Sequence, residues 1–489
     1  MGSIETETIS ELSLIIYDVR DARSLRRSDN RDIYLTLFKI GMTSLPTIDT
    51  PKPIQLGQWI TNPLKYMHDY DRQCGDIFSL KMSGALDRTV FISNPQTIQQ
   101  VLTNDTKQFS APGSINKILQ PFLGDRGVIL LDGGEHRQRR QLLMPQFHGD
   151  KIRVYTDLIC TVTRDLVEQW QLDETINLRE QMQSISLSVI LQAVFGLYRG
   201  ERYDLIRDKL NAVLALIDSP INASFLLIPV LQQDLGAWSP WGRFLRDREE
   251  LDRLIYLEIA DRRRNYQPDR SDILNMLIGS KDADGNGMSD VELHDELMTM
   301  LFAGHETTAT ALSWAIYWIN YLPEVKAKLI AELATIGTER DAITISRLPY
   351  LNAVCSETLR IYPVGMLTFP RIVEEPVSLQ GYDIEPGTMI AGCIYLTHHR
   401  EDLYPEPHLF KPERFLERQF SPYEYLPFGG GSRRCIGMAL AQLEMKLVLV
   451  EILDRCQLEL TGKLPATPAR RGVTLGPKGG IDAKVVSKN

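Results

Sequence analysis

One cysteine lies behind a glycine-rich stretch, FGGGSRRCIG, at residues 428–437. Apolar residues follow Cys435 at helical spacing, at positions 436, 440, 443, 447 and 450. Cys435 therefore lies where a loop becomes a helix, and the backbone N–H groups and helix dipole there favour its thiolate form. A zinc site is not expected, because it needs more ligands nearby. A solitary thiolate suits a haem iron, and a buried free cysteine is the alternative.

A second polar cluster interrupts a long apolar run, where residues 303–308 read AGHETT. Gly304 lacks a side chain, so a ligand or a bulky ring could approach the backbone. Thr307 and Thr308 can donate hydrogen bonds to backbone carbonyls four residues earlier. Glu306 beside Thr307 could form a proton relay, because a buried acid and a hydroxyl can pass a proton between them. The alternative is a polar patch that only satisfies itself.

Two further pairs of side chains have the spacing of neighbours on a helix. His136 and Arg140 are four residues apart, so they share one face and could bind carboxylates. A solvated basic surface helix is the alternative. Glu357 and Arg360 are three residues apart on another predicted helix. Taken alone, this second pair indicates no more than a surface ion pair.

These motifs resemble those of the cytochrome P-450 family. The residues that match the fixed positions of its haem-binding loop are Phe428, Gly431, Arg433, Cys435 and Gly437. The resemblance implies that Cys435 is the axial thiolate of haem b. It places Phe428, Arg433 and Gly437 in the cofactor site.

The other motifs occur in the family's order along the chain. The resemblance implies that Glu306 and Thr307 form the catalytic pair that delivers protons during oxygen activation. It joins Glu357 and Arg360 to Arg414 in a buried network that supports the haem loop. It implies that four basic residues bind the haem propionates: His136, Arg140, Arg371 and Arg433.

The elements that must position these residues are predicted to be mostly helices. A capping box, S-x-x-E at Ser289 and Glu292, starts a helix of about 34 residues that ends before Pro323. Its apolar character would also suit a membrane span, but Glu306 in the middle argues for a buried helix. Alternating patterns predict strands at 76–82 and 89–93, on either side of Gly84, and further strands within 371–392. A strand-like run is also expected at 128–131.

The predicted fold class is mainly α with a small β region. The resemblance implies a cytochrome P-450 fold, a single domain with a long central buried helix. We expect this haem-thiolate domain to span residues 51–489. Residues 1–50 form an N-terminal extension of unknown role.

Composition excludes several classes of protein. The chain of 489 residues is 43% hydrophobic and carries a net charge of −9, so nucleic-acid binding is not expected. The six cysteines are widely spread and form no CxxC pair, which argues against a disulfide framework. The N-terminus has no basic start and no apolar run long enough for a secretory signal or a membrane span. We expect a cytoplasmic monomer.

The resemblance implies a monooxygenase that inserts one oxygen atom from O2 into a hydrophobic substrate. The chain is similar to soluble bacterial, including cyanobacterial, members, which makes a fatty acid or other lipid-like molecule the leading substrate. A terpene is the alternative. Two alternatives from other functional classes stay open: a thiolate-haem peroxygenase or isomerase, and a non-catalytic haem sensor. Candidate pocket residues are all apolar: Ile115, Ile118, Leu214, Met298, Leu301, Phe302, Val364, Met366, Leu367 and Leu475.

Electrons are expected from a separate donor, because the chain ends soon after the helix that follows Cys435. By resemblance this donor is a ferredoxin with its NAD(P)H-dependent reductase. A basic docking face could be formed by Arg137, Arg139, Arg434 and Lys446. The apolar connector at 219–240 is interpreted as a lid over the substrate entrance with shallow peripheral contact to a membrane.

Overall fold

The computed structural model describes residues 45–81, 87–147, 154–217, 232–282, 284–337 and 341–488. The predicted extension at 1–50 therefore lies almost wholly outside the described residues. Among the described residues, those within 46–376 and 385–488 belong to one compact unit, and residues 377–384 belong to a second unit. The predicted domain start at residue 51 stays a prediction.

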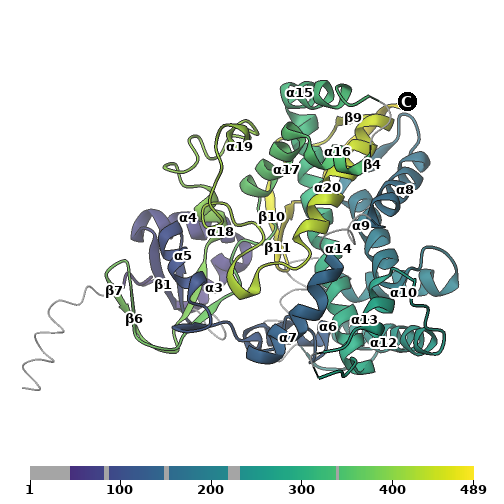
Figure 1. Cartoon of the computed structure of the whole chain (residues 1–489). Coiled ribbons are helices and arrows are strands. Elements are labelled where there is room, and N and C mark those ends of the chain that lie inside the picture. The colour runs from purple at the N-terminus through teal and green to yellow at the C-terminus, as the bar shows by residue number, and fades with distance from the viewer. Residues whose placement is uncertain are drawn as a thin grey trace, which may run out of the picture. The chain divides into compact units, whose positions relative to one another are not determined.

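Helices make up most of the described chain and follow the predicted order (Figure 1). Their bounds are α3 (Lys52–Thr61), α4 (Pro63–Cys74), α5 (Pro95–Thr103), α6 (Gln120–Leu123), α7 (Gly133–Leu143), α8 (Val154–Gln169), α9 (Leu178–Phe195), α10 (Glu201–Leu214), α12 (Pro240–Arg264), α13 (Ile273–Gly279), α14 (Asp290–Tyr321), α15 (Pro323–Ala334), α16 (Ala342–Arg347), α17 (Pro349–Ile361), α18 (Ile394–His398), α19 (Arg414–Glu417) and α20 (Met438–Arg455).

The strands form small sheets. The largest has five strands in the order β1-β2-β8-β5-β3, with β2 and β8 parallel and the other pairs antiparallel. The other sheets have the orders β4-β12-β9 and β10-β11, and β6 and β7 form a hairpin. The bounds are β1 (Ile77–Lys81), β2 (Asp87–Ile92), β3 (Phe109–Ser110), β4 (Thr175–Asn177), β5 (Arg371–Val373), β6 (Val377–Leu379), β7 (Tyr382–Ile384), β8 (Met389–Gly392), β9 (Cys456–Leu460), β10 (Pro468–Arg471), β11 (Thr474–Pro477) and β12 (Asp482–Lys488).

The predicted strand pair on either side of Gly84 is confirmed as β1 and β2, although Gly84 itself lies outside the described residues. The predicted strands within 371–392 are confirmed as β5 to β8. The expected strand at 128–131 is wrong, because Val128–Leu130 form a turn. Within the described residues, this segment pairs with no strand. It instead wraps around the guanidinium of Arg433, which binds its backbone carbonyls.

Helix α14 is the long buried helix that the capping box predicts. The Ser289 side chain accepts a bond from the Glu292 backbone, and the Glu292 carboxylate accepts one from the Ser289 backbone. The helix has 32 residues, which corresponds to about 48 Å. It packs against α9, α12 and α20, and most of its side chains are buried.

Gly304 also lies at a close contact between two helices. A Cβ atom at this position would lie 2.9 Å from Cδ1 of Ile190 on α9. The hydroxyl of Ser186 on α9 also donates to the Gly304 carbonyl over 3.4 Å. The missing side chain therefore allows two helices to approach each other, and Gly304 also lines the large cavity, so its backbone is open to a ligand there.

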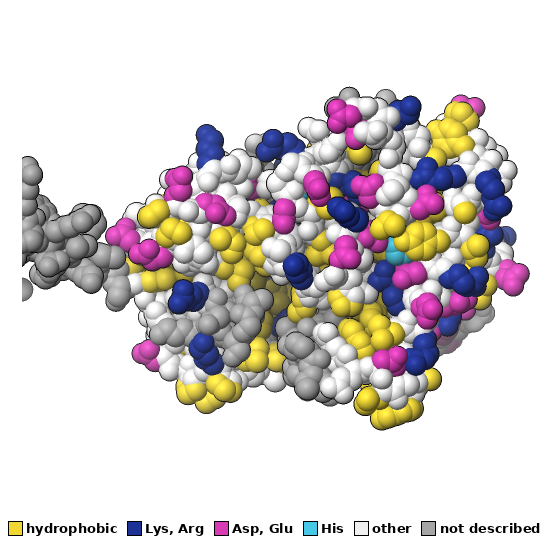
Figure 2. All heavy atoms as spheres, turned by 90° about the horizontal axis from the view of Figure 1, so that it is seen from below, with side chains coloured by type: hydrophobic (Ala, Val, Ile, Leu, Met, Phe, Trp, Pro, Cys, Tyr) yellow, Lys and Arg dark blue, Asp and Glu magenta, His cyan; other side chains and the backbone are white. Residues whose placement is uncertain are grey.

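None of the helices in the described part of the chain is long and apolar enough to cross a membrane. Residues 219–231 of the predicted lid lie outside the described residues. Beyond them, the side chains of Leu235 and Trp238 are 53% and 76% exposed, which agrees with an apolar contact surface there. Figure 2 shows one face of the molecule, on which apolar side chains gather in several places. Contact with a membrane stays a prediction.

Candidate active site

A cavity of ≈ 510 Å³ brings together side chains that are far apart in the sequence. Its wall takes residues from α7, α14 and α20, from the loop before α20 and from the segment 364–369. Of the predicted site residues, the following line it: His136, Arg140, Glu306, Thr307, Phe428, Arg433, Cys435 and Gly437. Arg371 does not.

Cys435 occupies a tight loop immediately before α20. Gly429 and Gly431 have φ angles of +64° and +65°, which glycine adopts without strain. The Cys435 N–H donates to the Phe428 carbonyl over 3.0 Å and closes the loop. Gly437 is the N-cap residue of α20, so the first backbone N–H groups of that helix lie next to the thiol.

The surroundings of Cys435 act on its acidity in opposite directions. The Cys435 side chain is exposed to the cavity, but the dense packing of protein around it desolvates the thiol and raises its pKa above the ordinary value. The backbone N–H groups of Gly437 and Met438 and the charges of Arg140 and Arg434 lower the pKa, but by less than burial raises it. The helix start and the arginines therefore favour the thiolate, as predicted, against the cost of desolvation. A cation bound to the sulfur would favour it further, because a coordinated thiol is deprotonated.

Glu306 and Thr307 lie in the same wall on α14. Arg179 Nη2 donates to Glu306 Oε1 over 2.8 Å, and Gln183 Nε2 donates to Oε2 over 2.7 Å. The Thr307 hydroxyl donates to the Ala303 carbonyl over 2.6 Å, as its position in the helix predicts. The two α9 residues were not found in the sequence, because no local pattern marks a partner more than a hundred residues away.

Two basic side chains on α7 face the cavity without strong internal partners. Arg140 makes no hydrogen bond or ion pair to a described residue, and burial lowers its pKa. Burial, and then the nearby charges of Arg433 and Arg140, lower the pKa of His136 to about 4. The His136 ring is therefore neutral near pH 7 and keeps one N–H donor. Both side chains can donate hydrogen bonds to carboxylates in the cavity.

The Arg433 side chain is hydrogen-bonded to backbone carbonyls of neighbouring segments. Its guanidinium donates to the carbonyls of Ala111, Val128 and Leu131 over 2.6 to 3.0 Å. Burial lowers its pKa to about 10, so it stays charged at neutral pH. Arg433 thereby holds the segment before α7 against the cysteine loop. To accept a hydrogen bond from Arg433, a carboxylate in the cavity would have to displace some of these carbonyl acceptors.

Arg371 is the predicted residue that the structure does not bring to the cavity. It is 1% exposed, and it donates to Asp105 Oδ2 through Nη2 over 2.8 Å and through Nε over 3.1 Å. Its Nη2 also donates to the Gly430 carbonyl over 3.0 Å. Its donors hold Asp105 and the cysteine loop, and its contact with a propionate stays a prediction.

Asp105 is a site residue that the sequence did not reveal. The same Oδ2 atom accepts bonds from the Ser432 backbone N–H over 2.7 Å and from the Ser432 hydroxyl over 2.9 Å. A side chain at Gly431 would collide with this carboxylate. Asp105 therefore positions the loop three residues before Cys435.

Asp105→Asn is expected to lower the free energy of unfolding by about 2 kcal/mol, because Arg371 loses its only charged partner among the described residues. Thermal unfolding and the cofactor content of the purified protein measure this effect. Asp402→Asn is the matched control, because Asp402 is 62% exposed in its pair with Arg400. Equal losses in the two variants would contradict the role of Asp105.

The predicted ion network of Glu357, Arg360 and Arg414 is confirmed. Arg360 donates to both carboxylate oxygens of Glu357, over 2.6 and 2.8 Å, and both side chains are 0% exposed. Arg414 Nε donates to Glu357 Oε1 over 3.1 Å. The pair on α17 is therefore a buried ion pair and not a surface one.

His398 links this network to the cysteine loop. Arg360 Nη1 donates to the His398 carbonyl over 2.8 Å, and His398 Nδ1 lies 3.3 Å from the Arg360 carbonyl. His398 Nε2 accepts the Leu426 N–H over 3.0 Å. Burial, and then the Arg360 charge, lower the pKa of His398 to about 3, so the neutral ring can donate at Nδ1 and accept at Nε2. Leu426 lies nine residues before Cys435, where the loop begins.

A sequence profile described as Cytochrome P450 matches residues 52–481. The chain belongs to the cytochrome P450 family. Cytochrome P450 135B1 of Mycobacterium tuberculosis is 35% identical over 437 residues, covering 88% of this chain and 89% of the relative. Cytochrome P450 135A1 of the same species is 33% identical over 417 residues, covering 85% and 89%.

Solved structures of cytochromes P450 share the fold. A retinoic acid-bound cyanobacterial CYP120A1 superposes with a TM-score of 0.78 at 23% identity, covering 92% of this chain and all of that one. The haem domain of cytochrome P450DA gives a TM-score of 0.79 at 21% identity, covering 91% and 97%. The predicted fold class, mainly α with a small β region, is therefore confirmed.

Cytochromes P450 use haem b held by a cysteine thiolate, together with dioxygen. The donor set of the cavity fits this group. Cys435 is the one cysteine in the wall, and no described cluster of three or more His, Cys, Asp or Glu side chains could hold a metal ion by itself. Arg140 and His136 supply donors for carboxylates. The individual roles of these residues remain predictions.

Four basic residues were predicted to form the docking face of this cytochrome P450, and only two of them are exposed. Arg137 and Arg434 are exposed. Arg139 is 7% exposed and pairs with Glu292 over 2.5 Å and with Glu296 over 2.8 Å, so it cannot meet a partner. Lys446 is partly buried, and its ammonium group donates to the Ser346 carbonyl over 3.2 Å. The prediction for these last two residues is wrong, because other helices cover them.

The predicted substrate pocket is also corrected in part. Phe302, Val364 and Leu367 line the cavity. Met298 and Leu301 on α14 are 1% and 0% exposed and pack into the core instead. A different face of α14 lines the cavity. The remaining predicted residues also lie outside the wall: Ile115, Ile118, Leu214, Met366 and Leu475.

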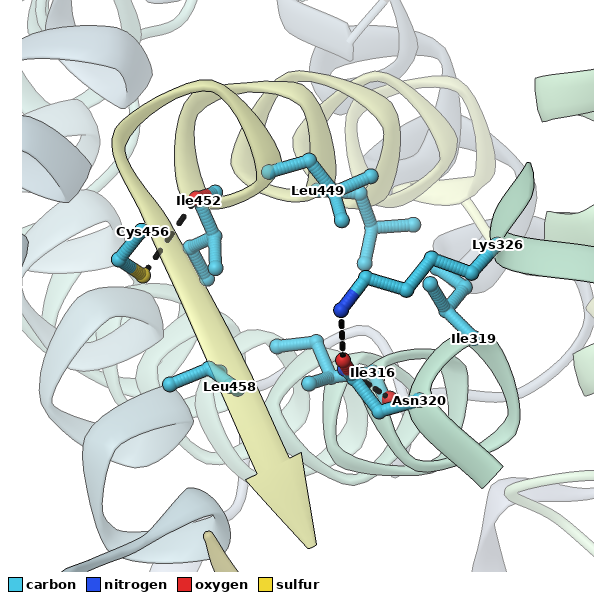
Figure 3. A pocket seen from close by; sticks show the side chains of 9 residues that line it. Ile316, Ile319, Asn320, Lys326, Leu449, Ile452, Cys456 and Leu458 are labelled. Atoms are coloured by element: carbon cyan, nitrogen blue, oxygen red, sulfur yellow. Dashed lines mark hydrogen bonds between the residues drawn. The ribbon is translucent and has the colours of Figure 1, made fainter. Parts of the chain in front are cut away.

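A second cavity lies between the end of α14, α20 and β9 (Figure 3). At ≈ 10 Å³ it has room for about one water molecule. Lys326 projects into it and donates to Asn320 Oδ1 over 2.8 Å. Its wall shares no residue with that of the large cavity, so it is separate from the cofactor site.

Proposed function

We propose that this cytochrome P450 hydroxylates a fatty acid or other lipid-like molecule, using O2 and electrons from a separate donor. The observation that supports this proposal is the large cavity, in which Cys435 and the pair Glu306 and Thr307 share one wall with mainly apolar side chains. Apolar walls favour a hydrophobic substrate, because burial of its surface drives binding.

When bound, haem b supplies the oxygen chemistry. In this proposal the Cys435 sulfur binds the metal, while His136 and Arg140 donate to the propionates. The wall keeps water away from the reacting carbon. Phe302, Val364 and Leu367 hold the substrate by apolar contact.

In this proposal, α14 carries the residues that transfer protons. The Glu306 carboxylate is anchored by Arg179 and Gln183 from α9. Among the described residues, Thr307 Oγ1 bonds only to the Ala303 carbonyl of its own helix, so its oxygen lone pairs stay available on the cavity side. A proton can pass from Glu306 to this hydroxyl through one water.

Thr307→Val is expected to lower product formed per electron consumed by about a hundredfold, because the hydroxyl leaves and the shape of the side chain stays. Product yield against NAD(P)H consumption measures this. Thr163→Val is the matched control, because Thr163 on α8 makes the same bond to a carbonyl four residues earlier and lies outside the cavity. Unchanged coupling in Thr307→Val would contradict the relay.

The electron donor in this proposal is a ferredoxin with its NAD(P)H-dependent reductase. Cytochromes P450 generally need such separate partners. Exposed Arg137 and Arg434 support docking of an acidic protein beside the cysteine loop. Reduction that slows at high salt would support docking at this face, and reduction independent of salt would count against it.

A terpene is the second candidate substrate. The CYP120A1 structure holds retinoic acid, which shows that a cytochrome P450 of this fold can take a terpene-derived molecule. A peroxygenase, isomerase or sensor is less well supported, because Glu306 and Thr307 are both present in the cavity wall.

One experiment tests both parts of the proposal. The carbon-monoxide spectrum of the reduced protein reports thiolate ligation. Spin-state shifts with a panel of fatty acids and terpenes report the substrate. A spectrum without thiolate character would reject the proposal, and turnover without any electron donor would support a peroxygenase or isomerase instead.

A further inference from the structure

A histidine outside the cavity wall lies between two acids near the start of α14. His294 is 3% exposed. Its Nδ1 atom lies 2.8 Å from Asp295 Oδ1, and its Nε2 atom lies 2.9 Å from Asp252 Oδ1 on α12. A carboxylate only accepts hydrogen bonds, and a neutral imidazole has only one N–H group. Both contacts are therefore hydrogen bonds only when the ring carries two protons and a positive charge.

Each of the two acids also binds other donors, which favour its carboxylate form. Asp252 Oδ1 accepts a bond from Arg248 Nε over 2.6 Å. Asp295 Oδ2 accepts the backbone N–H groups of Asp125 and Arg126, each over 2.8 Å. Burial raises the pKa of Asp295, but the imidazole and these N–H groups together lower it below its ordinary value. The shared proton therefore stays on the ring.

Other ionisable groups surround the imidazole and set how far it stays charged as the pH rises. Tyr256 on α12 stacks on the ring, with the centroids 4.5 Å apart. Burial lowers the pKa of His294, but its bonds to the two acids together raise it further, to above its ordinary value, against the charge of Arg248. The ring therefore stays charged to a higher pH than a free histidine does. The groups from α12, α14 and the loop before α7 are Arg248, Asp252, Tyr256, Asp290, Asp295, Asp125 and Arg126.

The imidazole acts on the cofactor site through the loop that Asp295 holds. A Cβ atom at Gly124 in this loop would collide with the Asp295 carboxylate, so the two are in close contact. The same loop leads into residues 128–131, whose carbonyls accept bonds from Arg433. Arg433 lies two residues before Cys435. The charge on the ring therefore supports the segment that holds the cysteine loop.

We propose that the charged imidazole of His294 is a positioning group that joins α12 and α14 to the loop before α7 and makes haem retention depend on pH. Its contribution is complete below pH 6.5, the ordinary pKa of histidine, and is lost as the pH rises through the higher pKa of the folded protein. Loss of the proton leaves one carboxylate facing a nitrogen lone pair, and the two repel each other. The inference concerns retention of the cofactor and is independent of the substrate.

The test measures the rate at which the haem-loaded protein loses haem to an excess of a haem-free globin between pH 6 and pH 9. We expect the unchanged protein to lose haem about tenfold faster at pH 9 than at pH 6, because a hydrogen bond to a charged group is lost. In Asp252→Asn the rise should begin at lower pH, because a neutral amide stabilises the imidazolium less. In His294→Gln the rate should be high at every pH, since glutamine donates to only one of the acids.

His408→Gln is the matched control, because His408 is exposed and lies outside the cavity wall. It should keep the profile of the unchanged protein. A shift of the midpoint to lower pH in Asp252→Asn separates the proposed charge from a merely structural role, which would change the rate equally at every pH. The same profile in all three variants would overturn the proposal.

A spectroscopic measurement keeps the proposal testable if His294→Gln does not fold. Nitrogen-15 spectra of histidine-labelled protein, recorded on the diamagnetic reduced carbon-monoxide complex, report whether each ring carries one proton or two. The signals whose midpoint moves in Asp252→Asn belong to His294. They should show mainly two protons at pH 6.5, where a free histidine is half protonated. A ring that is mainly neutral at this pH would contradict the charged clamp.

Discussion

Cys435→Ser is expected to abolish both monooxygenase turnover and the thiolate-type carbon-monoxide spectrum. The large cavity has no other cysteine in its wall, so no neighbouring sulfur can replace Cys435. A serine hydroxyl is much less acidic than a thiol and is a poor ligand for a haem iron. The absorption spectrum and product formation, measured on the same preparation, check this result.

The matched control for this prediction is Cys74→Ser. Cys74 is a free, partly buried cysteine at the end of α4 and lies outside the cavity wall. The control should keep both the spectrum and the activity. A Cys435→Ser protein that hydroxylates normally would overturn the assignment of the thiolate.

Glu357→Ala is expected to give protein with little bound haem and a free energy of unfolding lower by about 3–5 kcal/mol. The substitution leaves Arg360, which is 0% exposed, without a carboxylate partner. It also removes the bond to Arg414 and the acceptor of the Lys411 N–H. The loss reaches the cysteine loop, because Arg360 positions His398, which binds the Leu426 N–H.

Haem content per protein and thermal unfolding measure this loss. Glu413→Ala is the matched control, because its pair with Lys328 is half-exposed, with 37% and 55% of the side chains accessible. Such a pair contributes about 0–1 kcal/mol. Normal haem content in Glu357→Ala would contradict the supporting role of the network.

Several predictions succeeded because the signal was local in the sequence. The S-x-x-E box placed the start of α14 at Ser289 correctly, since the two residues cap each other within one turn. The i to i+4 spacing of His136 and Arg140 placed both in one cavity wall. The alternating residues of β1 and β2 predicted their pairing.

The predictions that failed concern charged side chains whose partners lie far away in the sequence. Arg139 and Arg140 are neighbours in the sequence, yet Arg139 turns to Glu296 while Arg140 faces the cavity. Nothing in the local pattern separates the two. Arg371 pairs with Asp105 from the end of α5, and neither residue lies in a motif that suggests the other.

The sequence by itself determined the family, the order of the main elements and the chemical groups that meet at the site. Caps, periodicity and motif spacing carry this information, because they act between residues close in the chain. Only the tertiary structure decided which charges are buried together and how acidic the Cys435 thiol is. Desolvation and pairing depend on every atom packed around a group, and those atoms come from helices that the sequence lists far apart.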